Sequence, residues 1–252
     1  MAKADKPRLD QVLVDRGLVE SRAKAQGLIM AGKVYSETRR LDKAGQKVSA
    51  DLPLEVKGQD HPWVSHGGLK LSKGLEHFDI SPDGLICLDV GASTGGFTDV
   101  LLVGGAKKVY AVDVGHGQLA WKIRQNPAVE VLERTNARYI TAEQISDPID
   151  LIVCDASFIG LQTVLPAALS LAAPGAHLIA LIKPQFEVGK GRVGKGGVVR
   201  EPELHREVCE KIQNWLESLA GWTVMGVTES PIKGPEGNRE FLICGACSAT
   251  CP

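Results

Sequence analysis

The hydrophobic pattern predicts two short helices and a small hairpin at the start of the chain. Apolar residues three and four positions apart form two stripes, made of Leu9, Val12 and Leu13 and then of Ala25, Leu28 and Ile29. Gly17 and Gly32 are placed to end these helices, because glycine readily adopts the left-handed backbone that closes a helix. Residues 34–35 and 48–56 indicate short strands around a turn at 42–45.

From residue 66 onward, apolar strands alternate with amphipathic helices. Strands are expected at residues 85–90, 108–114, 129–132, 151–154, 176–182, 222–228 and 241–246. Helices are expected at residues 68–78, 118–124, 161–172 and 201–219. A further helix is expected between the first of these strands and residue 102. This alternation predicts an α/β fold with a mostly parallel sheet covered on both faces. The last two strands should pair antiparallel, because the link between them is too short for a crossover helix.

The two patterns predict two domains. We place a small α+β domain at residues 1–57, a polar linker at 58–65 and the α/β domain at 66–252. Apolar residues make up 44% of the chain, enough for a buried core. The first 62 residues hold 12 Lys and Arg against 9 Asp and Glu, and the rest holds 17 against 21. The small domain is therefore the better candidate to bind a polyanion.

The chain lacks the signs of secretion or membrane insertion. It begins with charged residues and contains no run of 18 apolar residues, so we expect a cytoplasmic protein with reduced thiols and no membrane contact. Cys244, Cys247 and Cys251 lack a fourth ligand at zinc spacing, so no metal site is expected.

A glycine-rich turn follows the first strand of the large domain. It contains Asp89, Gly91, Ser93 and Gly95 and leads into a helix, whose N-terminus favours polar or anionic groups. Asp113 ends the next strand, where a carboxylate can accept both hydroxyls of a ribose. A nucleoside-bearing cofactor is therefore expected at this edge of the sheet. The dinucleotide pattern G-x-G-x-x-G is absent, which favours S-adenosylmethionine over NAD and leaves an NAD-dependent oxidoreductase as the alternative.

Two charged residues of opposite sign end neighbouring strands of the predicted sheet. Asp155 and Lys183 lie at the carboxyl ends of their strands, the edge where open α/β folds bind ligands. A glycine-rich loop follows, with Lys190, Arg192 and Lys195. It lacks the Ser or Thr that a phosphate-binding loop needs after its lysine. This loop either closes over a substrate phosphate or is a flexible surface loop.

The order of basic and apolar residues in the first domain resembles a known RNA-binding module. Arg8-Leu-Asp, Leu13-Val, Arg16-Gly-Leu and Ser21-Arg are similar to the αL module of a small-subunit ribosomal protein, pseudouridine synthases and tyrosyl-tRNA synthetases. The resemblance covers residues 8–56. It implies an RNA-binding surface whose exposed side chains contact phosphate and shape more than sequence, formed by Arg8, Arg16, Arg22, Lys24 and Lys33.

The large domain resembles the FtsJ-type ribose 2′-O-methyltransferases. Lys70, Asp155, Lys183 and Glu240 are similar to the Lys-Asp-Lys-Glu tetrad of that family. Together with the first domain, the chain resembles the TlyA family of rRNA 2′-O-methyltransferases, often labelled hemolysins. The resemblance implies a Rossmann-like class I methyltransferase fold, S-adenosylmethionine as donor, ribosomal subunits as partners and a ribose 2′-hydroxyl, usually of cytidine, as acceptor.

The resemblance also implies roles for individual residues. Lys183 is the candidate base, although positioning of the hydroxyl is the safer role, because a solvated lysine has a pKa of about 10.4. Asp89, Gly91, Ser93 and Gly95 are expected near the methionyl part of the cofactor, Asp113 at its ribose and Asn136 at its adenine. Asp155-Ala-Ser-Phe stands where amino-group methyltransferases carry Asp/Asn-Pro-Pro-aromatic, which favours an oxygen acceptor.

Two further interpretations stay open at this point. A non-catalytic RNA-binding protein would keep the sheet without the reaction, which the intact tetrad argues against. A membrane-lytic protein is suggested by the hemolysin label, but no cationic amphipathic helix of the membrane-inserting type supports it.

Overall fold

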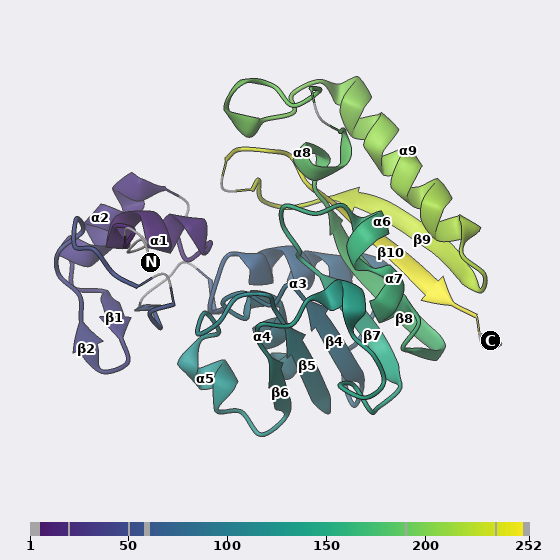
Figure 1. Ribbon diagram of the computed structural model, residues 1–252, viewed down its shortest axis with the longest axis horizontal. Helices are drawn as coiled ribbons and strands as arrows, with labels where there is room; N and C mark the ends of the chain where they lie inside the picture. The colour runs from purple at the N-terminus through teal and green to yellow at the C-terminus, as the bar shows by residue number, and fades with distance from the viewer. Residues whose placement is uncertain are drawn as a thin grey trace, which may run out of the picture.

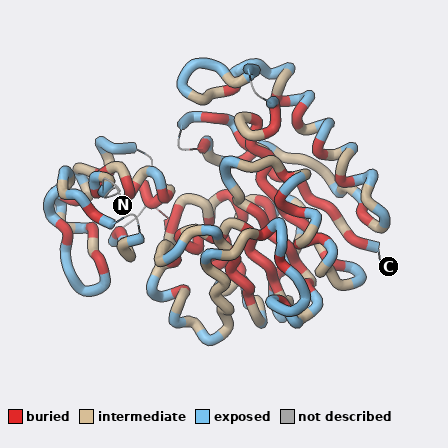
Figure 2. The backbone as a smooth tube through the Cα atoms, viewed as in Figure 1, coloured by how far each residue is buried: buried red, intermediate tan, exposed pale blue. Residues whose placement is uncertain are grey.

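The computed structural model describes residues 6–19, 21–49, 51–57, 61–189, 191–234 and 236–248. A small N-terminal unit, residues 6–57, lies beside a larger α/β unit that begins at residue 61 (Figure 1). Buried backbone concentrates in the central strands of the large unit (Figure 2).

The N-terminal unit contains the two predicted helices and a three-stranded sheet. Its elements are α1 (Leu9–Asp15), α2 (Arg22–Met30), β1 (Val34–Ser36), β2 (Arg39–Arg40) and β3 (Glu55–Val56), with strand order β2-β1-β3. Ser21 caps α2 by accepting the Lys24 N–H at 3.2 Å. A turn lies close to the expected position, where the Gln46 N–H donates to the Lys43 carbonyl at 3.1 Å. It does not close the hairpin, because β1 and β2 turn at residues 37–38, where Glu37 adopts a left-handed φ of 54°.

The large unit is built on a seven-stranded sheet. Its strands are β4 (Ile86–Val90), β5 (Lys108–Val112), β6 (Val129–Leu132), β7 (Ile149–Cys154), β8 (Ala172–Ile182), β9 (Trp222–Glu229) and β10 (Phe241–Cys247). The strand order is β6-β5-β4-β7-β8-β10-β9, with β10 antiparallel to both its neighbours and the other pairs parallel. The predicted Rossmann-like arrangement with antiparallel last strands is confirmed.

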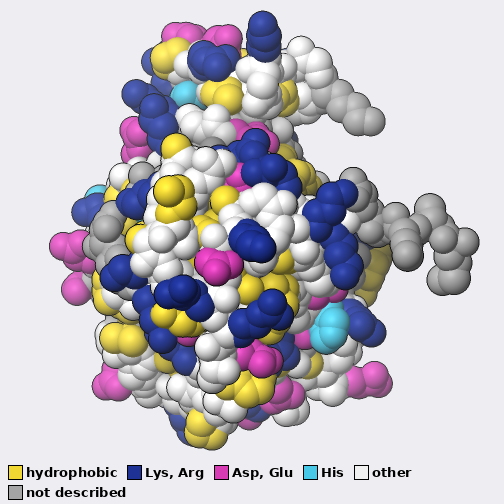
Figure 3. All heavy atoms as spheres, turned by 90° about the vertical axis from the view of Figure 1, so that its left-hand side faces the viewer, with side chains coloured by type: hydrophobic (Ala, Val, Ile, Leu, Met, Phe, Trp, Pro, Cys, Tyr) yellow, Lys and Arg dark blue, Asp and Glu magenta, His cyan; other side chains and the backbone are white. Residues whose placement is uncertain are grey.

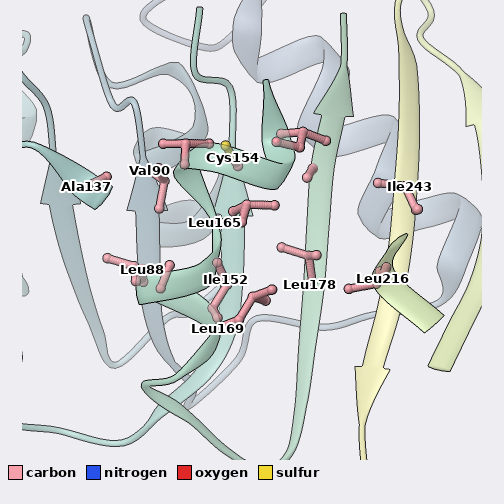
Figure 4. Close-up of a cluster of buried hydrophobic side chains, with 14 of the residues drawn as sticks. Leu88, Val90, Ala137, Ile152, Cys154, Leu165, Leu169, Leu178, Leu216 and Ile243 are labelled. Atoms are coloured by element: carbon pink, nitrogen blue, oxygen red, sulfur yellow. The ribbon is translucent and has the colours of Figure 1, made fainter. Parts of the chain in front are cut away.

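Helices cover both faces of this sheet. On one face lie α3 (Gly67–Phe78), α4 (Gly96–Val103) and α5 (Trp121–Arg124), and on the other α6 (Leu161–Val164), α7 (Pro166–Leu169) and α9 (Pro202–Ser218). Short helical turns lie in the connections: η1 (Ala137–Tyr139) after β6, α8 (Pro184–Glu187) directly after β8, and η2 (Lys195–Gly197) between α8 and α9. Figure 4 shows Leu88 and Val90 of β4, Ile152 of β7 and Leu178 of β8, which belong to the core between the sheet and the layer of α6, α7 and α9.

One predicted helix differs from the structure. Residues 161–172 were expected to form a single helix, but α6 and α7 are separate and β8 begins at Ala172. Pro166 begins α7, because proline cannot donate the N–H that a continuous helix would need.

The cysteines also depart from one expectation. Cys87, Cys154, Cys209 and Cys244 are free thiols, whereas Cys247 is disulfide-bonded, so the expectation of reduced thiols was wrong at that position. Cys251 lies outside the described residues. Within the described ranges, no group of three or more His, Cys, Asp and Glu side chains is arranged to hold a metal ion. No helix in this part of the chain is long and apolar enough to cross a membrane.

Candidate active site

Four charged side chains from distant parts of the sequence meet at the carboxyl edge of the sheet. Lys70 of α3 forms an ion pair with Glu240, with Nζ and Oε2 2.5 Å apart. Lys183 forms a second ion pair with Asp155, with Nζ and Oδ1 2.6 Å apart. The structure thus brings the four predicted tetrad residues together as two Lys–carboxylate pairs.

The sheet register explains this convergence. Asp155 and Lys183 each directly follow neighbouring parallel strands, β7 and β8. Because β10 runs antiparallel to β8 with Phe241 opposite Ile182, Glu240 enters its strand where Lys183 leaves its own. Helix α3 lies close to both strands through Gly74, where an added Cβ would stand 3.2 Å from a methyl group of Ile179.

Mutual attraction keeps the site charged despite its burial. Burial alone would lower the pKa of Lys70, but the Asp155 and Glu240 carboxylates outweigh it, so this pKa is raised. Burial would likewise raise the pKa of Asp155, but Lys183 and Lys70 outweigh it, so this pKa is lowered. At neutral pH, Lys70 is therefore an ammonium and Asp155 a carboxylate.

Lys183 is held by three oxygen atoms. Besides the Asp155 carboxylate, its Nζ donates to the backbone carbonyl of Asp155 at 3.0 Å and to Ser157 Oγ at 2.8 Å. These two hydrogen bonds use two of the three N–H donors of the ammonium, while Asp155 Oδ1 faces the Nζ as an ion-pair partner outside hydrogen-bond geometry. The arrangement fixes the direction of the Lys183 side chain.

The glycine turn between β4 and α4 adopts left-handed backbone at several positions. Gly91, Ser93 and Gly95 have φ angles of 84°, 47° and 93°. A Cβ at Gly91 would lie 2.9 Å from the Ala156 Cα, so this position requires glycine. Asp113 stabilises the turn, since its Oδ2 accepts the Ser93 N–H at 2.8 Å and its Oδ1 accepts the Gly115 N–H at 2.7 Å.

Asp89 is buried beneath the glycine turn. Its Oδ2 accepts a 2.6 Å hydrogen bond from Thr98 Oγ1, while its buried Oδ1 has no hydrogen-bond partner. Burial raises the pKa of Asp89 to about 7, with the Thr98 hydrogen bond opposing and the nearby Asp155 and Asp113 carboxylates adding to the rise. An uncompensated buried carboxylate oxygen at this place favours a cationic group nearby.

A cleft of about 780 Å³ opens beside these residues. Among the predicted site residues, its walls include Gly91, Ser93, Asp113, Asn136 and Asp155. Asp89 and Gly95 are not on these walls. Gly95 instead packs under α5, where an added Cβ would stand 2.9 Å from Leu119 Cδ1.

Most predicted RNA-binding side chains lie at the surface. Arg8, Arg22 and Lys33 are exposed and Lys24 is half-buried, and basic side chains spread over the face that carries the N-terminal unit (Figure 3). The expectation that Arg16 is exposed was wrong: it is 8% exposed and its guanidinium donates to the Leu52 carbonyl at 2.6 Å.

The basic loop has its own fixed contacts. Arg192 pairs with Glu207, Lys195 lies in η2, and Lys190 is outside the described residues. Asn238 joins this loop to the segment that carries Glu240. Its Nδ2 donates to the Gly197 carbonyl at 2.9 Å, and its Oδ1 accepts the Val199 N–H at 2.9 Å.

Sequence reasoning missed an exposed aromatic ring at the site. Phe158 lines the cleft, is 88% exposed and adopts a left-handed φ of 66°, and its ring centre lies 5.2 Å from that of Phe186. The signal available in the sequence was the aromatic residue three positions after Asp155, in the Asp155-Ala-Ser-Phe segment. Trp63 packs against the large unit, since an added Cβ at Gly68 would stand 2.4 Å from its ring.

Comparison with known proteins places this architecture in a family. Residues 63–247 match the FtsJ-like methyltransferase family, and residues 7–52 match the S4 domain. The chain belongs to the FtsJ-like methyltransferase family. It is a methyltransferase that carries an N-terminal S4 domain, and its likeness to TlyA proteins places it with them in this family.

Two relatives and one solved structure cover most of the chain. The 16S/23S rRNA (cytidine-2'-O)-methyltransferase TlyA of Mycobacterium tuberculosis is 49% identical over 95% of this chain and 90% of its own length. Hemolysin A of Brachyspira hyodysenteriae is 41% identical over 93% of this chain and 98% of its own length. A solved Streptococcus thermophilus protein, described as a candidate hemolysin, is 41% identical and superposes with a TM-score of 0.80 over 98% of this chain and 90% of its own. None of these findings favours the NAD-dependent oxidoreductase.

Proposed function

We propose that this protein transfers a methyl group from S-adenosylmethionine to a ribose 2′-hydroxyl, that of a cytidine, in ribosomal RNA. The observation that carries the proposal is the meeting of Lys70, Asp155, Lys183 and Glu240 beside a cleft that is walled by the glycine turn. The names of the TlyA relatives support the substrate class. An rRNA substrate places the reaction in the cytoplasm.

The residues around the cleft suit a cofactor that carries both positive charge and a nucleoside. The partnerless Oδ1 of Asp89 lies below the glycine turn, where a cationic methionyl group would offset its burial. Asp113, Asn136, Gly91 and Ser93 line the cleft. We expect Asp113 to bind the ribose, Asn136 the adenine, and the backbone at Gly91 and Ser93 to lie close to the ligand. When bound, the cofactor supplies an electrophilic methyl group.

The tetrad positions the acceptor hydroxyl. A 2′-hydroxyl is a weak nucleophile, so its alignment with the methyl group accounts for much of the rate. Lys183, which contacts three oxygen atoms, orients the hydroxyl. Lys70, paired with Glu240, attracts the Asp155 carboxylate and keeps it charged. A base role for Lys183 is the narrower hypothesis, because its ammonium must first lose a proton before Nζ can accept the hydroxyl proton.

The N-terminal unit binds the RNA. Exposed Arg8, Arg22 and Lys33 are suited to phosphate contacts, which give affinity and placement with little sequence readout. Lys190, Arg192 and Lys195 are proposed to contact RNA near the site. We retain the domain limits 1–57 and 66–252, joined by a linker at 58–65, as part of this proposal.

Transfer of a labelled methyl group to purified ribosomal subunits tests the function. The wild-type protein should label rRNA, and digestion to nucleosides should show the label as 2′-O-methylcytidine by mass spectrometry. Lys183→Ala should abolish labelling while binding of S-adenosylmethionine persists. Lys107→Ala, which removes an exposed lysine beside β5, is the matched control and should stay active. Label on a base or on protein, or full activity of Lys183→Ala, would contradict the proposal.

A further inference from the structure

The cofactor cleft has a wall from each unit of the protein. Besides the sheet edge, four residues at and around α1 line it: Pro7, Val12, Asp15 and Arg16. The RNA-binding unit is therefore part of the boundary of the site where the cofactor is proposed to bind.

Contacts with the large unit hold the end of α1 in place. The Arg16 carbonyl accepts from Thr94 Oγ1 of the glycine turn at 3.5 Å. The Gly17 carbonyl accepts the His66 N–H, next to the start of α3, at 3.2 Å. An added Cβ at Gly117 would lie 2.8 Å from the Asp51 carbonyl oxygen, so this loop of the large unit also approaches the N-terminal unit closely.

Asp15 brings a negative charge to this wall. It is the last residue of α1, and the carboxyl end of a helix carries partial negative charge. Gln11 Nε2 donates to Asp15 Oδ1 at 2.7 Å, which orients the carboxylate. The neighbouring Arg16 guanidinium donates to the Leu52 carbonyl at 2.6 Å.

The charge of the ligand changes during the proposed reaction. S-adenosylmethionine carries a sulfonium and has a net charge of +1, whereas S-adenosylhomocysteine, left after the methyl group moves to oxygen, is neutral. A carboxylate on the cleft wall therefore attracts the donor more than the product, and low-dielectric walls strengthen that attraction.

We propose that Asp15, a residue of the RNA-binding unit, is part of the cofactor site and favours the sulfonium donor over its neutral product. This inference rests on the proposed function and goes beyond it, since it assigns a cofactor-selecting role to the unit that binds RNA. It also couples the two ligands: RNA that displaces α1 changes cofactor affinity, and by linkage the cofactor changes RNA affinity by the same factor.

Isothermal titration of the full chain with each nucleoside, at 50 mM salt, tests the inference. Asp15→Asn should weaken S-adenosylmethionine binding about two- to fivefold and leave S-adenosylhomocysteine binding unchanged. Asp15→Lys should weaken donor binding by about tenfold, and both effects should shrink in 500 mM salt. Asp42→Asn removes an exposed carboxylate of the same unit that does not line the cleft, and it should behave as wild type.

Two failures can be told apart. If the wild-type protein binds neither nucleoside, the proposed function falls and the role of Asp15 falls with it. If the wild-type protein binds the donor but both Asp15 variants match Asp42→Asn, only the role of Asp15 is overturned. Equal weakening of donor and product would also overturn it, because charge selection requires a difference between the two.

Discussion

Lys70 and Glu240 stand 170 positions apart in the sequence, and their Nζ and Oε2 atoms lie 2.5 Å apart in the structure with both side chains buried. Removing either partner leaves an unpaired charge in a low-dielectric site. Lys70→Met or Glu240→Leu alone should therefore lower the free energy of unfolding by about 3–5 kcal/mol, as measured by urea denaturation. Each should also abolish methyl transfer.

The double variant separates stability from function at this pair. Lys70→Met combined with Glu240→Leu removes both charges, so it should recover part of the lost stability. Methyl transfer should stay absent, because Asp155 loses one of the two lysines that orient it. A double variant no more stable than either single one, or one that regains activity, would show that this pair does not act as described.

Asp89 should make the stability of the cofactor-free protein fall as pH rises. Its pKa is raised by burial from 3.8 to about 7, so the folded state binds the proton more tightly than the unfolded state. The associated stability is present below about pH 4 and is lost as pH rises towards 7. Asp89→Asn removes this loss. The free energy of unfolding of the variant, relative to that of wild type, should therefore rise between pH 5 and pH 8 in urea denaturation. Exposed Asp83→Asn is the control, and parallel pH profiles of Asp89→Asn and wild type would refute the assignment.

The order of elements could be predicted because the hydrophobic period changes with secondary structure. A strand buried on both faces of a parallel sheet has a nearly continuous apolar sequence, which made β4, β7 and the second half of β8 recognisable despite Asp89 and Asp150. The break between α6 and α7 was missed because proline is tolerated in the first turn of a helix, so Pro166 alone does not reveal that a new helix begins there. The pairing within the tetrad was also beyond the sequence, because it depends on the register of β8 and β10.

Arg16 and Phe158 show a second limit, which concerns single side chains. Residue type favours an exposed arginine, but the Leu52 carbonyl supplies a buried acceptor that no local pattern reveals. Phe158 is notable for its backbone, a left-handed φ in a bulky residue, and a φ angle is not written in the sequence. The burial of Arg16 depends on a contact from elsewhere in the fold, and the feature that distinguishes Phe158 is its backbone geometry.

The Phe158 ring is placed to stack on a base of the substrate. A bulky residue rarely adopts left-handed backbone, and this ring is 88% exposed at the cleft. Stacking on an aromatic ring contributes about 1–3 kcal/mol per base, so Phe158→Ala should lower methyl transfer to rRNA about 5- to 150-fold. Cofactor affinity and protein stability should be unchanged, and Phe158→Trp should retain activity. Val103→Ala, at another exposed apolar residue, is the control, and undiminished transfer by Phe158→Ala would refute the stacking role.

Substitutions of Arg16 and Lys33 should distinguish a basic residue that stabilises the fold from one that binds RNA. Arg16→Met removes the buried donor to the Leu52 carbonyl, which should destabilise the protein by about 1–3 kcal/mol in thermal or urea unfolding. Lys33 is exposed, so Lys33→Gln should leave stability unchanged and weaken RNA binding. Its logarithmic salt dependence between 50 and 200 mM salt should fall by about one unit, the share of one phosphate contact. Arg16→Met should keep the wild-type salt dependence of RNA binding. A reduced salt dependence for Arg16→Met, with lost stability for Lys33→Gln, would contradict the two assigned roles.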